Sequence, residues 1–126
     1  MELELHSVER KPFYFEISLS GRLDGSTYSR LEQLIASLMK TQVKGIVLDM
    51  GRLDYISSMG LRVIFKTMKD LKPGNGVLLV TNMQPQVKKV FEIAKALPDD
   101  SIFVSVQEAD QYYDIIQERV KKENQR

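Results

Sequence analysis

Hydrophobic residues recur at every second position in two segments near the start of the chain. Leu3 and Leu5 alternate with glutamates, and the segment 13–20 places Phe, Ile or Leu at each odd position. A period of two is typical of a strand with one buried face. We therefore expect these segments to pair as an N-terminal hairpin, followed by a loop from Gly21 to Thr27.

Four later segments carry apolar residues at helical spacing. Ser26, Thr27 and Ser29 are candidate caps for the first helix, and Ser29 with Glu32 fits a capping box. Pro85 suits the first turn of the third helix. The apolar positions of the four helices are Leu31, Leu34, Ile35 and Leu38; Leu61, Ile64, Phe65, Met68 and Leu71; Val87, Val90, Phe91 and Ala94; and Ala109, Tyr112, Tyr113, Ile116 and Val120.

Short apolar runs at 46–48, 77–80 and 102–104 lie between the helices and are typical of strands covered on both faces. The predicted order is β-β-α-β-α-β-α-β-α. Strands that alternate with helices imply right-handed crossovers and a largely parallel sheet, which the hairpin makes mixed. We expect one α/β domain over residues 1–120 and a polar tail at 121–126.

Ligand-binding loops of such sheets lie beyond the carboxyl ends of the strands. Two segments meet this condition, Gly21 to Thr27 and Gly51 to Ser58, because we expect the third strand to end near Asp49. A further turn, Gly74-Asn75-Gly76, links a helix to a strand, and its glycines are expected to serve the backbone geometry.

Composition narrows the possible classes of function. The 126 residues suffice for one domain, and 43% hydrophobic residues can form a core. A net charge of +1 gives no basic excess for nucleic acid. The chain has no cysteine, which excludes disulfides, a cysteine nucleophile and thiolate metal sites. We expect neither a metal nor a cofactor.

The beginning of the chain lacks the basic start and apolar run of a signal peptide. No segment reaches the roughly 18 apolar residues of a membrane helix. We therefore expect a cytoplasmic protein that does not insert into membranes.

Two adjacent serines, Ser57 and Ser58, stand where the second helix is predicted to begin. One hydroxyl can cap the helix, worth about 1 kcal/mol, so the other is expected to be exposed. Gly60 in the first turn lowers helix stability by about 1 kcal/mol relative to alanine. This glycine indicates close approach either by a partner or by the sheet. A phosphate at this position would meet free N–H groups and the positive helix end, and a partner packed there would be repelled.

The segment Asp54-Tyr55-Ile56-Ser57-Ser58-Met59-Gly60-Leu61-Arg62-Val63 resembles the signature of STAS domains, specifically of bacterial anti-sigma factor antagonists. Gly21-Arg22-Leu23-Asp24 resembles the family's Gly-x-Leu-Asp turn after the second strand. The resemblance covers nearly the whole chain in the same element order. It implies a STAS-like domain with a mixed, mostly parallel sheet, an N-terminal hairpin and about four helices.

The resemblance also implies a switch. An unphosphorylated antagonist binds an anti-sigma factor with serine kinase activity, is released when that kinase phosphorylates it, and is reset by a serine phosphatase. Alignment on Gly60-Leu61 puts Ser58 at the phosphorylated position, where Ser57 replaces the family's Asp and Met59 its following Ser. Ser58 is the expected acceptor, with Ser57 the less favoured choice. The expected partner-binding residues are Asp24, Ser57, Met59, Gly60 and Arg62.

Three alternatives, a hydrolase, a receiver domain and a nucleotide-binding domain, each lack essential residues. A hydrolase elbow requires glycine at position 56, where Ile56 stands, and His6 is the single histidine available for a triad. A receiver domain needs an acidic pair after its first strand in addition to Asp49, and glycine-loop nucleotide motifs are absent. We expect no catalytic residues. The remaining alternative is a constitutive STAS scaffold, or an accessory subunit of a signalling or transport complex.

Overall fold

The computed structural model describes residues 2–96, 119 and 121–123. Its first two strands, β1 (Glu4–Lys11) and β2 (Tyr14–Leu23), form the predicted antiparallel hairpin, with Leu5 opposite Leu19. Phe13 differs from the prediction of a buried strand residue. It stands in the turn with φ 73° and is 37% exposed. The alternating pattern therefore predicted the hairpin and placed its turn too early.

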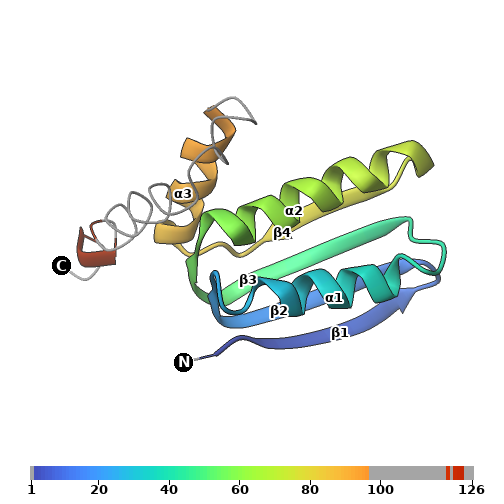
Figure 1. Ribbon diagram of the computed structural model, residues 1–126, viewed down its shortest axis with the longest axis horizontal. Coiled ribbons are helices and arrows are strands. Elements are labelled where there is room, and N and C mark those ends of the chain that lie inside the picture. The colour runs from blue at the N-terminus through green and yellow to red at the C-terminus, as the bar shows by residue number, and fades with distance from the viewer. Residues whose placement is uncertain (1, 97–118, 120, 124–126) are drawn as a thin grey trace.

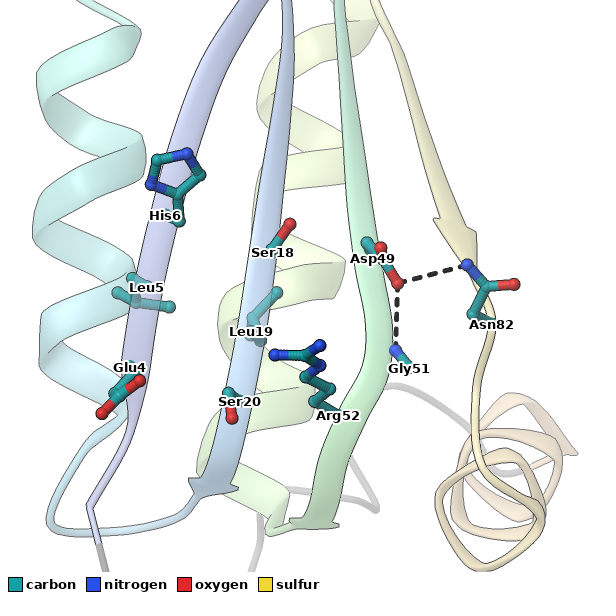
Figure 2. A pocket seen from close by; sticks show the side chains of 10 residues that line it. All are labelled: Glu4, Leu5, His6, Ser18, Leu19, Ser20, Asp49, Gly51, Arg52 and Asn82. Carbon is teal, nitrogen blue, oxygen red and sulfur yellow. Dashed lines mark hydrogen bonds between the residues drawn. The ribbon is translucent and has the colours of Figure 1, made fainter.

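Within the described residues, two parallel strands continue the sheet, β3 (Gly45–Ile56) beside β2 and β4 (Val77–Thr81) beside β3. The strand order is β1-β2-β3-β4, so the sheet is mixed, as predicted. Helices α1 (Tyr28–Leu38) and α2 (Ser58–Leu71) cover one face (Figure 1). We call the other face, from which the side chains of His6, Ser18 and Asp49 project, the open face (Figure 2).

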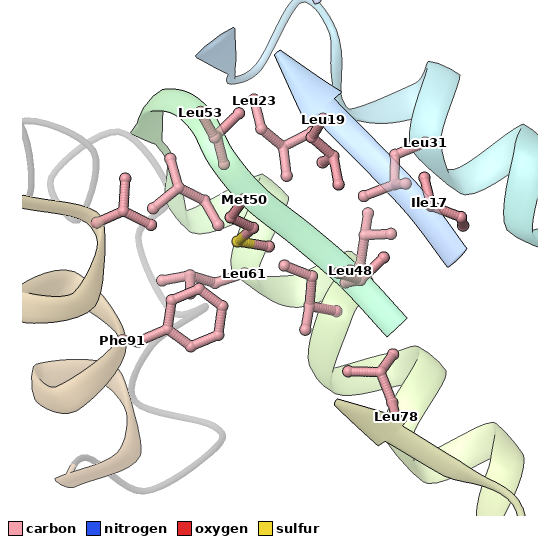
Figure 3. Close-up of a cluster of buried hydrophobic side chains, with 14 of the residues drawn as sticks. Ile17, Leu19, Leu23, Leu31, Leu48, Met50, Leu53, Leu61, Leu78 and Phe91 are labelled. Carbon is pink, nitrogen blue, oxygen red and sulfur yellow. The ribbon is translucent and has the colours of Figure 1, made fainter. Parts of the chain in front are cut away.

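The core lies between the sheet and the helices, where Figure 3 shows its aliphatic side chains gathered. Every second residue of β2 is buried from Ile17 to Leu23. The predicted inner face of α3 (Pro85–Ala96) is confirmed, since its four apolar residues are at most 3% exposed. The ring of Phe91 meets that of Phe65 edge-on at 6.0 Å, which joins α3 to α2.

The third strand is longer than predicted. It continues through the segment expected to be a loop and ends at Ile56, because the backbone bulges keep it paired with β2. The prediction of a loop from Gly51 to Ser58 is therefore wrong. Ser57 is the single residue between the end of β3 and the start of α2.

Two predicted details of the helix ends are also wrong. The helix α1 begins at Tyr28 with Thr27, one of the three predicted caps, at the N-cap position; Ser29 lies inside the helix, so the predicted capping box with Glu32 is wrong. After α2 and the short 3-10 turn η1 (Lys72–Gly74), the left-handed residue is Asn75, with φ 58°, and not a glycine. Asparagine tolerates this conformation better than most residues.

The predicted strand at 102–104 and most of the last predicted helix lie outside the described residues. Residues 119 and 121–123 are helical. Within the part of the chain that the structure describes, no helix combines the length and apolar character needed to cross a bilayer.

The candidate site at the start of helix α2

Ser57 connects the end of β3 to the start of α2. Its backbone is extended (φ −95°, ψ 173°), and its Oγ accepts a hydrogen bond from the Gly60 N–H at 3.3 Å. Its own N–H donates to the Leu23 carbonyl at 2.8 Å, and its carbonyl accepts from the Leu61 N–H at 3.0 Å. Ser57 is thus the N-cap of α2, which assigns the capping role that the sequence left open between two serines.

Ser58 is the first residue of α2 and is 0% exposed, while Ser57 is 1% exposed. The expectation that the second serine is exposed is therefore wrong. Its physical reason is the close seating of the first helical turn on the sheet. Capping rules describe the local backbone and do not predict what lies over the side chains.

Gly60 permits this close seating. A β-carbon at this position would lie 2.7 Å from Leu23 Cγ and 3.0 Å from Ile56 Cγ1. Both distances are below ordinary van der Waals contact, so the glycine is required for α2 to pack against β2 and β3. Of the two explanations that the sequence allowed, packing against the sheet accounts for Gly60, which is buried and faces the core.

Asp24 organises the turn between β2 and α1. Its Oδ1 accepts from the N–H and hydroxyl of Ser26 at 2.9 and 2.8 Å and from the Thr27 hydroxyl at 3.2 Å, while Arg22 Nε lies 3.5 Å from Oδ2. Burial raises the pKa of Asp24, but the bonds from Ser26 and Thr27 and the charge of Arg22 outweigh it, so the pKa lies below its ordinary value. Asp24 therefore remains ionised and fixes the entry to α1.

The sheet brings this turn beside the two serines. Strands β2 and β3 are parallel, with Arg22 opposite Tyr55 and Leu23 opposite Ile56, so they end side by side (Figure 1). The Arg22 guanidinium lies 3.9 Å from the centroid of the Tyr55 ring, a cation–π contact. The structure thus unites Asp24 with Ser57 and Ser58 at one end of the sheet, as expected, and adds Arg22 and Tyr55.

Comparison with known proteins decides the family. A family model for the STAS domain matches residues 7–109. The chain belongs to the STAS domain family. This confirms the resemblance that the segments Gly21–Asp24 and Asp54–Val63 indicated.

Relatives of this STAS domain include two named antagonists. BtrV of Bordetella bronchiseptica, provisionally named an anti-sigma factor antagonist, is 40% identical over 76 residues, which are 60% of this chain and 66%, just under two thirds, of BtrV. The anti-sigma-B factor antagonist of Staphylococcus aureus is 25% identical over 93 residues, 74% of this chain and 85% of that protein. The solved structure of the anti-sigma factor antagonist SpoIIAA in its unphosphorylated form has a TM-score of 0.68 at 22% identity, covering 73% of this chain and 81% of SpoIIAA. The last similarity shows the fold.

A shallow pocket of about 270 Å³ lies beside the start of α2 in the STAS domain. Met59, Arg62 and Lys66 of α2 line it together with Tyr28 and Glu32 of α1. Arg62 and Lys66 are exposed, and Met59 is half-buried. The sequence predicted a surface around Met59 and Arg62 but missed the contribution of α1. The sequence signal for this contribution was that the first helix is predicted to start directly after the turn at Asp24.

The open face of the sheet has a larger polar hollow of about 770 Å³, whose lining residues Figure 2 shows. Asp49 Oδ1 accepts from the Gly51 N–H at 3.0 Å and from Asn82 Nδ2 at 3.2 Å, so this carboxylate ties β3 to the segment after β4. His6 lies opposite Ser18 on this face. It is therefore separated from Ser58 by the sheet, and the two side chains form no catalytic pair.

Proposed function

We propose that this STAS domain is an anti-sigma factor antagonist that regulates sigma-factor-dependent transcription. When unphosphorylated, it binds an anti-sigma factor with serine kinase activity; phosphorylation of Ser58 releases it, and a serine phosphatase resets it. The contact surface comprises Asp24, Met59 and Arg62, while the buried residues Ser57 and Gly60 hold the helix start in place beneath it. The protein acts by binding, in the cytoplasm, and contacts no nucleic acid itself.

The observation that carries this proposal is that the two serines differ in position: Ser57 is the N-cap of α2, and Ser58 is its first residue. Ser57 makes the capping bond to Gly60 N–H, so a modified Ser58 leaves that bond in place. The first turn of α2 contains no acidic residue that would repel a phosphate. The positive end of the helix dipole stabilises an anion at this position by roughly 0.3–1 kcal/mol. Helix α2 therefore tolerates a phosphoserine at its first residue.

The burial of Ser58 adds a step to the switch. A kinase needs the hydroxyl in its own active site, so the first turn of α2 must open for the transfer. Phosphate adds about −1.5 to −2 charges at neutral pH, and an unpaired charge of this size is unfavourable in the interior. The phosphorylated side chain therefore cannot return to the buried position of Ser58. The partner therefore meets a new charge at the start of α2, where the capping bond of Ser57 remains in place.

Incubation with the cognate anti-sigma factor kinase and ATP tests the proposal. We expect one phosphoryl group per chain by mass spectrometry, abolished in Ser58→Ala and retained in Ser57→Ala. We also expect the unphosphorylated chain to bind the kinase and the phosphorylated chain to lose binding by at least tenfold, or about 1.4 kcal/mol. Labelling that survives Ser58→Ala contradicts the site, and absence of binding by the unphosphorylated chain contradicts the function.

The second candidate is a constitutive scaffold or an accessory subunit of a signalling or transport complex. The burial of both serines is the observation that favours it, since a permanent cap needs no accessible hydroxyl. A pull-down distinguishes the candidates. Recovery of an ATPase resembling a histidine kinase supports the switch, and recovery of a transporter or a large homo-oligomer supports the scaffold.

A further inference from the structure

The exposed large apolar side chains of the described residues gather at the end of the sheet where β2, β3 and β4 begin. They are Phe13, Tyr14, Val77 and Leu79, which are 37%, 38%, 53% and 55% exposed. The strand register places Tyr14, Gly45 and Val77 in one row across β2, β3 and β4, and Glu16, Val47 and Leu79 in the row of the next outward-facing residues. We call Phe13, Tyr14, Val47, Val77 and Leu79 the apolar patch.

Gly45 makes the apolar patch continuous. A β-carbon at this position would lie 2.7 Å from Cδ1 of Tyr14, so the tyrosine ring lies over the glycine and fills the gap between β2 and Val77. A hollow of about 110 Å³ remains within the patch, lined by Tyr14, Val47, Val77 and Leu79 among others. Contiguous exposed apolar surface with a concave centre is typical of a binding site for another molecule.

Two lysines, Lys11 and Lys44, contact aromatic rings of the apolar patch. Lys11 Nζ lies 4.4 Å from the Tyr14 ring centroid, and Lys44 Nζ lies 5.6 Å from that of Phe13.

The neighbouring acids of the sheet are already engaged. Glu16 pairs with Arg10 at 3.1 Å, and a Glu9 carboxylate oxygen accepts from the Phe13 N–H at 3.1 Å. The Arg10–Glu16 pair cancels and Glu9 keeps its charge, so Lys11 and Lys44 together leave the rim with a net positive charge.

We propose that the apolar patch docks an acidic amphipathic segment of a partner protein, one in which apolar side chains lie among carboxylates. Apolar side chains would fill the hollow, and the carboxylates would meet Lys11 and Lys44 at the rim. A second copy of this chain does not fit, because the two lysine rims would face each other. The four part-exposed side chains also supply much less than the roughly 800 Å² per partner of a stable interface between folded proteins.

The docking surface is independent of the proposed switch. Strand β3 begins in the patch at Gly45 and ends beside the serines at Ile56. Twelve residues at about 3.3 Å each separate the two ends by roughly 35–40 Å. A segment bound at the patch therefore leaves Asp24 and the start of α2 uncovered for a second partner at the same time.

The proposal can be tested with synthetic peptides and the intact, ¹⁵N-labelled chain. The probe is a peptide of alternating leucine and glutamate; the controls replace glutamate by lysine or leucine by serine. We expect saturable NMR shifts for the probe at Tyr14, Val47, Val77 and Leu79, and none at the start of α2. Both control peptides should bind at least fivefold more weakly.

Surface variants locate the binding. Leu79→Thr keeps a strand-forming residue and should weaken binding about five- to tenfold, as should Lys11→Glu combined with Lys44→Glu. Arg52→Glu, at the polar end of the open face, is the matched control and should leave binding unchanged. Native amide dispersion verifies that each variant is folded.

Four results would overturn the proposal. The first is absence of saturable shifts, and the second is equal binding of the lysine peptide. The third is concentration-dependent dimerisation that Leu79→Thr abolishes, which would assign the patch to a second copy. The fourth is sedimentation of the chain with vesicles of phosphatidylglycerol, lost in the lysine double variant, which would assign it to a membrane surface.

Discussion

Leu23 occupies the space into which a β-carbon on Gly60 would project, with its Cγ only 2.7 Å from that position. The contact joins the last residue of β2 to the first turn of α2. Asp24 follows Leu23 directly. The Ser57 N–H donates a hydrogen bond to the Leu23 carbonyl at 2.8 Å, and a displacement of Ser57 would break it. The turn at Asp24 and the start of α2 are therefore joined by two contacts, which must break when the first turn of α2 opens.

The Gly60→Ala substitution should lower the free energy of unfolding by about 1–3 kcal/mol. Alanine ordinarily stabilises a helix by up to about 1 kcal/mol relative to glycine, but here the clash with Leu23 and Ile56 outweighs that gain. Urea unfolding monitored by circular dichroism measures the change. Gly25→Ala is the matched control, since a β-carbon at Gly25 would have no atom within 4 Å. Equal stability of the two variants would contradict the packing argument.

Gly21→Ala should destabilise the fold more than Gly60→Ala. Gly21 has φ +104°, and a β-carbon there would lie 2.2 Å from the backbone oxygen of Glu2. A backbone atom cannot rotate away as the leucine side chain can, and the backbone conformation itself disfavours alanine. Thermal unfolding measures the loss. Removal of residues 1 and 2 from the variant should restore part of the stability, and a full restoration would show that the dihedral angle carries no penalty.

Removal of the helix cap gives a third expectation. Ser57→Ala deletes the acceptor for the Gly60 N–H and should lower the free energy of unfolding by about 1 kcal/mol. Ser29→Ala, inside α1, removes a hydroxyl that makes no capping bond and serves as the control. Chemical denaturation measures both. A loss in the control as large as that in Ser57→Ala would exclude capping as the cause.

Asp24 makes stability depend on pH in the acid range. Because its folded-state pKa lies below the ordinary value of 3.8, its carboxylate stabilises the fold fully above that value. The contribution disappears as the pH falls through the lowered folded-state pKa. The stability difference between wild type and Asp24→Asn should therefore shrink as urea unfolding is repeated from pH 7 down to about pH 2. A constant difference over this range would show that the charge of Asp24 is not responsible.

The sequence predicted the structure best where buried residues recur along the chain with a simple period. Ile17 and Leu19 of β2, and Val90 and Phe91 of α3, lie in the core as their spacing indicated. It failed for the second half of β3, because the strand inserts extra residues opposite Ser18–Ser20 and Gly21–Arg22. Each bulge shifts the alternation by one, so a continuous strand has the polar and glycine-containing pattern of a loop.

Topology predicted where the candidate residues lie relative to one another, and it did not predict their exposure. The neighbouring carboxyl ends of β2 and β3 follow from topology, and they place Asp24 near Ser57. The burial of Ser58 depends on tertiary packing that a helix-capping pattern does not contain. The contribution of Tyr28 and Glu32 likewise depends on the tertiary packing of α1 beside α2, which the sequence pattern does not contain.

The beginning of the chain is anchored beside Gly21, and this determines where a fusion partner would emerge. The Glu2 oxygen faces Gly21, and Arg30 of α1 donates a hydrogen bond to the Leu3 carbonyl. In Figure 1 the N-terminus lies at the end of the sheet where β2 and β3 finish and α2 begins. An affinity tag or fluorescent protein fused there would lie at the same end of the sheet as Asp24 and the start of α2, where we propose that the partner binds, so the tag should be cleaved before affinities are measured.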